Sequence, residues 1–312
     1  MKKKIILTVL TIILVLIIVA TAIVGNYFYD LALNPNSSKT LVLGDSEETE
    51  EDIEQERKDN LWLSAYSEDS YIESDDHLKL HSYEIKNEVE TNKWVIAIHG
   101  YMNEGKGMIT GAQHFYDMGY NVLVVDLRGH GTSEGDYIGM GWDDRLDIVK
   151  WIDYLVQKNQ DSQIVLYGLS MGAATVMMTT GEELPSNVKC AIEDCGYTSV
   201  WDEFAAQLKD LFNLPTFPAL NAANLVTRIR AGYNLKEASS VEQVKKSKTP
   251  TLFIHGDEDT FVPYSMLDTV YEAANCEKEK LVIEGAKHAK AASINPELYW
   301  KTVKQFTEKY VK

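Results

Sequence analysis

The stretch that decides the fold reads Ile164-Val165-Leu166-Tyr167-Gly168-Leu169-Ser170-Met171-Gly172. Its first four residues are apolar without interruption, as expected of a parallel strand that is buried on both faces. Mostly small and apolar residues then continue to Thr180, which is typical of a buried helix. Glycines two positions before and two positions after Ser170 relieve crowding where a strand turns sharply into a helix. The pattern therefore predicts a strained turn that presents the Ser170 hydroxyl, with the Met171 N–H at a helix N-terminus, where it can help to bind an oxyanion.

Short apolar runs alternate with helical patterns from about Leu61 to Lys312. The strand-like runs lie at 77–85, 94–98, 121–127, 164–167, 188–192, 252–254 and 281–283. The helical patterns lie at 142–155, 171–180, 265–274 and 296–310. Such alternation implies a mostly parallel central sheet with helices on both faces, which binds its ligands beyond the carboxyl ends of the strands.

One stretch interrupts this alternation, because two helical patterns follow one another between about Tyr197 and Lys236 without a strand between them. We predict that they form a small helical cap over the strand ends. The cap has more aromatic residues than two short exposed helices need for their own packing, so some of them should line an apolar substrate pocket. The aromatic residues in question are Trp201, Phe204, Phe212 and Phe217.

A serine hydroxyl is a weak nucleophile at neutral pH unless a base accepts its proton, and that base must be oriented by a third group. Only two histidines, His255 and His288, follow Ser170 in the chain. His288 lies on the loop after the last predicted strand, at the carboxyl edge of the sheet, so we predict that it is the base. His255 ends the preceding strand, and we interpret it as a hydrogen-bonded structural residue.

Three carboxylates, Asp257, Glu258 and Asp259, compete for the orienting role in the loop after the penultimate strand. Asp259 lies deep enough in this loop to reach His288, so we favour Asp259. Asp257 is more typical of a residue that stabilises a turn. The loop after the first parallel strand, His99-Gly100-Tyr101, is expected to supply a second oxyanion donor, the Tyr101 N–H.

Taken together, these segments resemble the α/β-hydrolase superfamily. The matching motifs are His99-Gly100-Tyr101, Asp126-Leu127-Arg128-Gly129-His130-Gly131-Thr132-Ser133, Gly168 to Gly172, His255 to Pro263, and Gly285-Ala286-Lys287-His288. The second motif is typical of the lysophospholipase-like and serine-aminopeptidase-like branch, in which it is usually a structural loop. The resemblance implies an α/β-hydrolase fold with a Ser170–Asp259–His288 triad. With its apolar N-terminus and short cap, the chain looks like membrane-attached bacterial hydrolases. Relatives that bind halides or open epoxides use Asp as the nucleophile, so Ser170 excludes those activities.

We expect the reaction to be hydrolysis of a carboxylic ester of small to medium acyl length through an acyl-enzyme, without a metal or an organic cofactor. The apolar cap favours an apolar acyl group. A serine peptidase of the aminopeptidase-like branch is the alternative, and a non-catalytic binding protein on the same fold is a third possibility. The three cysteines have neither CxxC nor zinc-ligand spacing, so we interpret them as core residues.

The N-terminus predicts attachment to a membrane. Lys2, Lys3 and Lys4 precede a nearly unbroken apolar run from Ile5 to Val24. A helix of about 20 apolar residues spans the hydrocarbon layer of about 30 Å. Because lysines next to a span stay in the cytoplasm, the rest of the chain should lie outside the cell membrane. Secretion after signal-peptide cleavage at Ala20-Thr21-Ala22 is the alternative, although the run continues past Ala22.

We therefore divide the chain into a membrane anchor at 1–29, an acidic tether at 30–60 and a catalytic domain at 61–312, with the cap insertion at 197–236. The tether is dense in Asp and Glu, so we expect it to be solvated, with a short acidic helix as the alternative. The formal net charge of −17 makes nucleic acid an improbable partner. The expected partners are the membrane and a small acyl ester or lipid-derived substrate.

Overall fold

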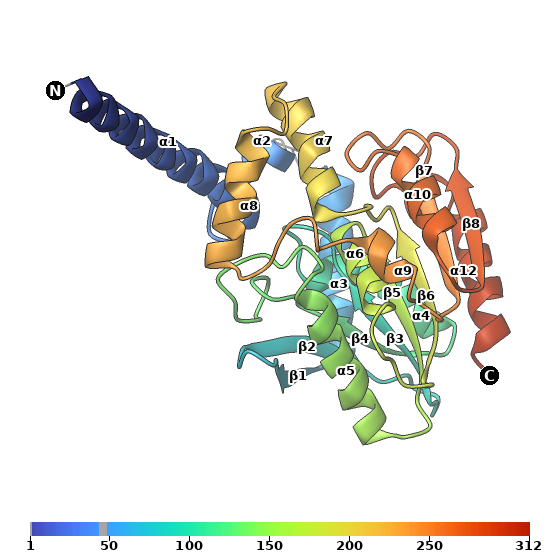
Figure 1. Ribbon diagram of the computed structural model, residues 1–312. Coiled ribbons are helices and arrows are strands. Elements are labelled where there is room, and N and C mark those ends of the chain that lie inside the picture. Colours follow the sequence, from blue (N-terminus) through green and yellow to red (C-terminus); the bar gives the residue numbers. More distant parts are fainter. Residues whose placement is uncertain (1, 44–48) are drawn as a thin grey trace.

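The computed structural model describes residues 2–43 and 49–312, and an eight-stranded, mostly parallel sheet lies at its centre (Figure 1). The strands are β1 Ser67–Glu73, β2 Lys79–Ile85, β3 Lys93–Ile98, β4 Asn121–Val125, β5 Gln163–Leu169, β6 Val188–Asp194, β7 Thr251–Gly256 and β8 Lys278–Ile283. Their order is β1-β2-β4-β3-β5-β6-β7-β8, in which β1 and β2 pair antiparallel and all neighbours from β4 to β8 pair parallel. The predicted α/β-hydrolase fold is confirmed.

Helices cover both faces of this sheet. The helices of the described residues are α1 Lys2–Leu33, α2 Thr40–Leu43, α3 Glu50–Tyr66, the 3₁₀ helix η1 Gly105–Met108, α4 Ile109–Asp117, α5 Asp144–Lys158, α6 Met171–Thr179, α7 Val200–Phe212, α8 Ala219–Arg230, α9 Ser240–Val244, α10 Ser265–Ala273, α11 Ala291–Ile294 and α12 Pro296–Tyr310. Successive residues of β3 point to opposite faces: Ile96 joins a core with α5 and α6, whereas Val95 joins a core with α4 and α12. Both faces are apolar because both are buried, as the unbroken apolar runs predict.

The cap consists of α7 and α8, which follow β6 and lie beside the carboxyl ends of the parallel strands (Figure 1). Ser199 begins α7 by accepting a hydrogen bond from the Asp202 N–H, and Asn213 ends it in a left-handed conformation. The loop 213–218 then leads into α8, which runs against α1. The helical pair thus occupies the stretch predicted for the cap.

The last turns of α1 belong to the folded domain, which the predicted division at residue 29 did not anticipate. Tyr29 and Leu33 are buried in the core beneath the cap. Gly25 lies directly against α8, where a Cβ would approach the Ala222 carbonyl oxygen to 2.5 Å. The Lys39 ammonium donates hydrogen bonds to carbonyl oxygens at the end of α1, where a cation offsets the negative end of the helix dipole.

The predicted acidic tether at 30–60 also differs from the structure. Residues 44–48, which include the start of its acidic run, lie outside the described residues. Residues after Glu50 form α3, which matches the alternative of an acidic helix. Its Leu63 is buried against the second face of the sheet, and Asp59 accepts a hydrogen bond from the Thr110 hydroxyl. The segment is therefore attached to the domain rather than wholly solvated.

Candidate active site

Ser170 lies in the sharp turn between β5 and α6. Its backbone has φ 57° and ψ −116°, a conformation that costs energy for a residue with a side chain. The flanking glycines are required, because a Cβ at Gly172 would lie 2.0 Å from the Ile98 carbonyl oxygen. A Cβ at Gly168 would likewise lie 2.2 Å from the Gly172 carbonyl oxygen. The turn therefore holds the serine side chain out at the end of the strand, as the motif predicts.

His288 and Asp259 come together beside this serine, from the loops after β8 and β7. The Ser170 Oγ lies 2.8 Å from His288 Nε2. On the other side of the ring, His288 Nδ1 lies 2.7 Å from Asp259 Oδ2. A carboxylate can only accept, so Nδ1 carries the proton and Nε2 is left with a lone pair that faces the serine hydroxyl. In this tautomer, the imidazole ring of His288 is oriented to accept the serine proton.

The loop around Asp259 explains why this carboxylate, and not a neighbour, reaches His288. Asp259 Oδ1 accepts hydrogen bonds from the Phe261 and Val262 N–H groups, which hold the side chain toward the ring. Asp257 is exposed, and its carboxylate accepts from the Gly285 N–H, which stabilises the turn instead. The structure therefore brings together the three residues chosen from the sequence.

The second histidine, His255, contacts the acid rather than the serine. It is fully buried, and its Nε2 lies 3.1 Å from the Val262 carbonyl oxygen and 3.2 Å from Asp259 Oδ2. Burial by itself raises the pKa of Asp259, but the hydrogen bonds from His255 and His288 outweigh it and hold that pKa below its ordinary value. Asp259 is therefore an anion at neutral pH, as an orienting acid must be.

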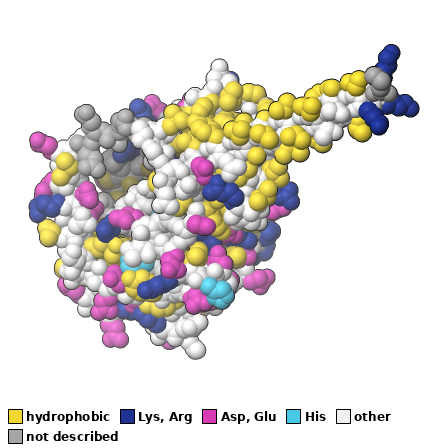
Figure 2. All heavy atoms as spheres, turned by 90° about the vertical axis from the view of Figure 1, so that its left-hand side faces the viewer, with side chains coloured by type: hydrophobic (Ala, Val, Ile, Leu, Met, Phe, Trp, Pro, Cys, Tyr) yellow, Lys and Arg dark blue, Asp and Glu magenta, His cyan; other side chains and the backbone are white. Residues whose placement is uncertain are grey.

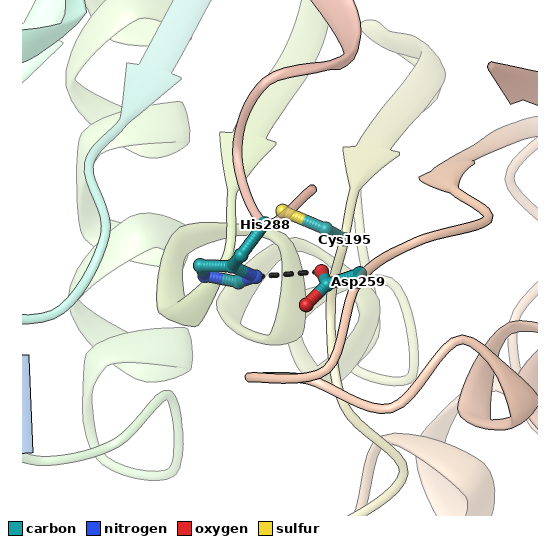
Figure 3. Close-up of side chains that lie close together, drawn as sticks. All are labelled: Cys195, Asp259 and His288. Atoms are coloured by element: carbon teal, nitrogen blue, oxygen red, sulfur yellow. Dashed lines mark hydrogen bonds and ion pairs between the residues drawn. The ribbon is translucent and has the colours of Figure 1, made fainter. Parts of the chain in front are cut away.

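Cys195 also lies beside the acid and the base (Figure 3). One ligand atom from each of Cys195, Asp259 and His288 falls within 4.8 Å of the others, which is close enough to consider a metal site. However, both ring nitrogens of His288 already have partners, and burial holds the pKa of the Cys195 thiol well above its ordinary value. A metal at this position would require a Cys195 thiolate and a free lone pair on the His288 imidazole. His288 and Asp259 are therefore better suited to proton transfer than to metal binding.

The two residues predicted to supply oxyanion donors, Met171 and Tyr101, line the same cavity as Ser170. Met171 is the first residue of α6, so its N–H has no acceptor within the helix. Gly100 packs against the serine, because a Cβ on it would lie 3.4 Å from Ser170 Cβ. Tyr101 follows Gly100, and its hydroxyl donates to the Ala32 carbonyl oxygen of α1 at 2.7 Å. Their role as oxyanion donors stays a prediction.

A cavity with mainly apolar walls leads to Ser170 and contains about 840 Å³ of empty space, part of it open to solvent. Three elements build its walls: the strand-end loops, the cap and the end of α1. Cap residues in the wall include Phe204, Leu208 and Phe212, and those from α1 include Phe28, Tyr29 and Ala32. Phe28 and Phe212 meet edge to face across the cavity rim, with ring centroids 5.4 Å apart. The site is therefore suited to an apolar group placed beside a nucleophilic serine.

The chain is similar in sequence and in fold to known proteins. Residues 89–214 match the family described as serine aminopeptidase, S33. The uncharacterized protein YqkD of Bacillus subtilis is 30% identical over 220 residues, which cover 70% of this chain and 72% of that protein. The esterase Pf2001 of Pyrococcus furiosus aligns with a TM-score of 0.66 and 25% identity over 81% of this chain and 96% of its own.

The chain belongs to the α/β-hydrolase superfamily. It is also 25% identical to a protein of Saccharomyces cerevisiae named as an uncharacterized membrane protein, YNL320W, over 74% of this chain and 76% of that one. Ser170, the predicted nucleophile, follows β5 and precedes the buried helix α6, which is the strand-to-helix context of a nucleophile elbow.

The Asp126–Ser133 loop of this α/β-hydrolase is structural, as expected. The Asp126 carboxylate accepts hydrogen bonds from the Gly105 and Thr132 N–H groups, and it lies 2.7 Å from His81 Nδ1. Arg128 forms a two-point ion pair with Asp147 in the interior. These bonds connect the loop after β4 to its neighbours, and neither residue contacts the serine.

Sequence reasoning missed two polar residues in the cavity wall, Glu203 and Gln207 on α7. Gln207 donates to Glu203 Oε1, whereas Glu203 Oε2 has no partner among the described residues. Burial raises the pKa of Glu203 to about 8, and the nearby charge of Asp259 adds to this effect. Their helical spacing could have indicated this position, because Glu203 and Gln207 are four residues apart and adjoin the apolar stripe of Phe204 and Leu208.

Proposed function

We propose that this chain is a membrane-attached serine hydrolase that cleaves carboxylic esters with an apolar acyl group. The observation that carries the proposal is the hydrogen-bonded series from Ser170 to His288 to Asp259, in which Ser170 lines an apolar cavity. Burying an acyl chain contributes about 0.8 kcal/mol of binding free energy for each methylene removed from water, so such a cavity favours apolar acyl groups over polar substituents.

In the proposed reaction, each residue of the site acts through an atom that the geometry makes available. His288 Nε2 removes the hydroxyl proton as the Ser170 oxygen attacks the acyl carbonyl carbon. The Met171 and Tyr101 N–H groups then donate to the oxyanion, and Asp259 stabilises the imidazolium that has formed. His288 returns the proton to the leaving alkoxide, and the acyl-enzyme is hydrolysed when the same histidine activates a water molecule.

The proposed membrane attachment depends on α1, the one helix in the described part of the chain that is long and apolar enough to cross a bilayer. Lys2 to Lys4 lie before the span, so we place the catalytic domain outside the cytoplasm.

A peptidase activity is the second candidate, because the matching family is described as serine aminopeptidase. The two candidates separate in one preparation of the full-length chain in detergent, assayed with p-nitrophenyl esters of graded acyl length and with aminoacyl p-nitroanilides. We expect ester turnover that increases with acyl length up to the capacity of the cavity. The Ser170→Ala variant should lose this turnover by several orders of magnitude.

A fluorophosphonate probe supplies the control for nucleophile reactivity. It should label the natural chain and leave Ser170→Ala unlabelled. Anilide cleavage in the absence of ester cleavage would replace the esterase proposal by the peptidase. Failure of the probe to label Ser170 in the folded protein would indicate a non-catalytic binding protein.

A further inference from the structure

The substrate cavity and the membrane-spanning helix share one wall. Phe28, Tyr29 and Ala32 of α1 line the cavity, although every residue of the same helix from Lys2 to Ala20 is exposed. A helix of that exposed length measures about 28 Å, which matches a hydrocarbon layer of about 30 Å. If this exposed part crosses the bilayer, the membrane boundary falls within two turns of Phe28. The cavity then lies next to the lipid headgroups.

The contact between α1 and α8 places the cap, like the cavity, next to the expected membrane boundary. Ala222 and Val226 of α8 touch Gly25, and the Arg230 guanidinium donates to Asp30 at 2.9 Å. These three α8 residues are four apart and therefore form one stripe along the helix that faces α1. The contact is close, since only a glycine at position 25 fits between the backbones. The α8 helix is therefore held beside α1 immediately after the exposed part of the span.

The neighbouring stripe of α8 carries large apolar side chains that the protein leaves uncovered. Leu225 and Ile229 precede Val226 and Arg230 by one residue each, and they are 47% and 75% exposed. In the loop before α8, Leu214 is 41% and Phe217 is 73% exposed. We call these four residues the cap apex. Figure 2 shows that the apolar surface of α1 continues onto the body where this helix joins it.

Exposed apolar groups of this size cost free energy in water, and continuous patches of them mark interaction surfaces. These side chains lie along α8 and the loop before it, and α8 packs against a helix that is itself suited to a bilayer, so lipid is the partner that would cover both. Arg228 is exposed on α8 next to Ile229, and beside a membrane its charged end would reach the phosphate level while its stem stays in apolar surroundings. A charge of this sign attracts the anionic headgroups of a membrane surface.

We propose that the cap apex inserts into the outer lipid interface beside α1, and that the cavity receives its ester directly from the bilayer. This inference rests on the proposed hydrolase function for the identity of the substrate, and it names the class: an amphipathic ester with its acyl chain in the membrane. The acyl chain would enter the cavity beside α1 and extend toward Ser170 along the apolar lining, which includes Phe28 and Phe212.

The insertion is tested by fluorescence quenching, which requires no hydrolysis. A full-length Cys276→Ser background removes the half-buried thiol, while Cys190 and Cys195 are buried. Phe217→Cys and Val89→Cys are each labelled with an environment-sensitive fluorophore and reconstituted in phosphatidylcholine vesicles that carry nitroxide lipids. Val89 is the matched control, because it is 72% exposed on the body of the domain. We expect several-fold stronger quenching at position 217 than at position 89. Equal quenching at both positions overturns the insertion, whatever the activity.

The route is tested by the pair Phe217→Ser/Ile229→Ser against Val89→Ser in the same vesicles. We expect the pair to lower kcat/KM for a long-chain p-nitrophenyl ester held in the vesicles by at least fivefold. Its kcat/KM for soluble p-nitrophenyl butyrate and its rate of fluorophosphonate labelling should match those of the natural chain. Val89→Ser should change neither reaction. An unchanged ratio of long-chain to short-chain activity overturns the route. Absence of both activities and of labelling in the natural chain, with strong quenching at position 217, would instead refute the hydrolase proposal and leave the insertion standing.

Discussion

At the scale of single residues, the site depends on which carboxylate holds His288. Asp259 does so because two backbone N–H groups fix its side chain and because it stays ionised. Asp257, two residues earlier, makes only the turn-stabilising bond to Gly285. The pair therefore offers a matched comparison within one loop.

We predict that Asp259→Asn lowers kcat for a soluble ester by about 10³- to 10⁴-fold, since the amide favours the wrong tautomer of His288. Asp257→Asn should lower it by less than about threefold, because loops tolerate the loss of one exposed bond. Steady-state kinetics of both variants, with melting temperatures to verify folding, test the assignment. A crippled Asp257→Asn beside a mild Asp259→Asn would assign the orienting role to the other residue.

Glu203 makes the stability of the cap depend on pH. Its pKa in the folded protein is about 8, above the ordinary value near 4.5, so the folded state retains a proton that the unfolded chain loses. The stabilising contribution is complete below the unfolded pKa and is lost as the pH rises toward 8. Glu203→Gln keeps the shape and the bond from Gln207 but cannot ionise.

We expect Glu203→Gln to raise the free energy of unfolding at pH 8 by on the order of 2–4 kcal/mol, and to change it much less at pH 5. Melting temperatures of both proteins from pH 5 to pH 8 in one detergent provide the measurement. Parallel curves across that range would show that Glu203 does not hold its proton in the folded state.

At the scale of elements, the cap aromatics divide into groups that their sequence pattern does not distinguish. Phe204 and Phe212 line the cavity. Trp201 is half-buried on the outer side, where the Lys236 ammonium lies 4.1 Å from its ring centroid. Phe217 is largely exposed on the cap apex. Only the first two should act on the acyl chain directly.

We predict that Phe204→Ala and Phe212→Ala lower the ratio of long-chain to short-chain kcat/KM by about tenfold, because losing contact with two methylenes costs about 1.6 kcal/mol. Trp201→Ala should instead lower the melting temperature and leave that ratio unchanged. Graded p-nitrophenyl esters and thermal unfolding distinguish the two outcomes. If all three variants lowered only the melting temperature, the cap would have no part in substrate selection.

At the scale of the whole molecule, the anchor and the domain form one structure. The acidic surface, with its formal net charge of −17, adjoins an apolar helix whose N-terminal end carries Lys2, Lys3 and Lys4. This arrangement is typical of a single span with a cytoplasmic lysine cluster and an outer domain. Cleavage after Ala22 would still leave Gly25, Tyr29 and Leu33 in their contacts with the cap.

We predict that protease added to intact cells removes the activity or releases a fragment that a fluorophosphonate still labels. The chain before treatment should have its full-length mass, since we expect the span to be retained. A cytoplasmic marker enzyme that stays intact is the control. Complete protection until the cells are lysed would place the domain in the cytoplasm instead.

The sequence by itself determined most of the sheet and the choice of Ser170, His288 and Asp259, because each of these features depends on a short stretch of consecutive residues. Buried strands require unbroken apolar runs, and a strained elbow requires glycine on both sides. The edge strand β1 was missed because most of its residues are polar. The helix α4 was also missed, although its buried residues Ile109, Ala112 and Phe115 have helical spacing. The boundary of the anchor was misplaced for a related reason. An apolar span has no polar face to reveal which residues pack against protein.

Only the tertiary structure decided what surrounds the serine. The cavity joins Phe28 to Phe212 and Glu203, residues that lie more than 170 positions apart in the chain. Their meeting depends on the close approach of α1 to α8 at Gly25, where the absence of a side chain lets two backbones touch. Packing between two distant segments depends on the shape and burial of both segments. The sequence pattern of one segment does not show which other segment it packs against.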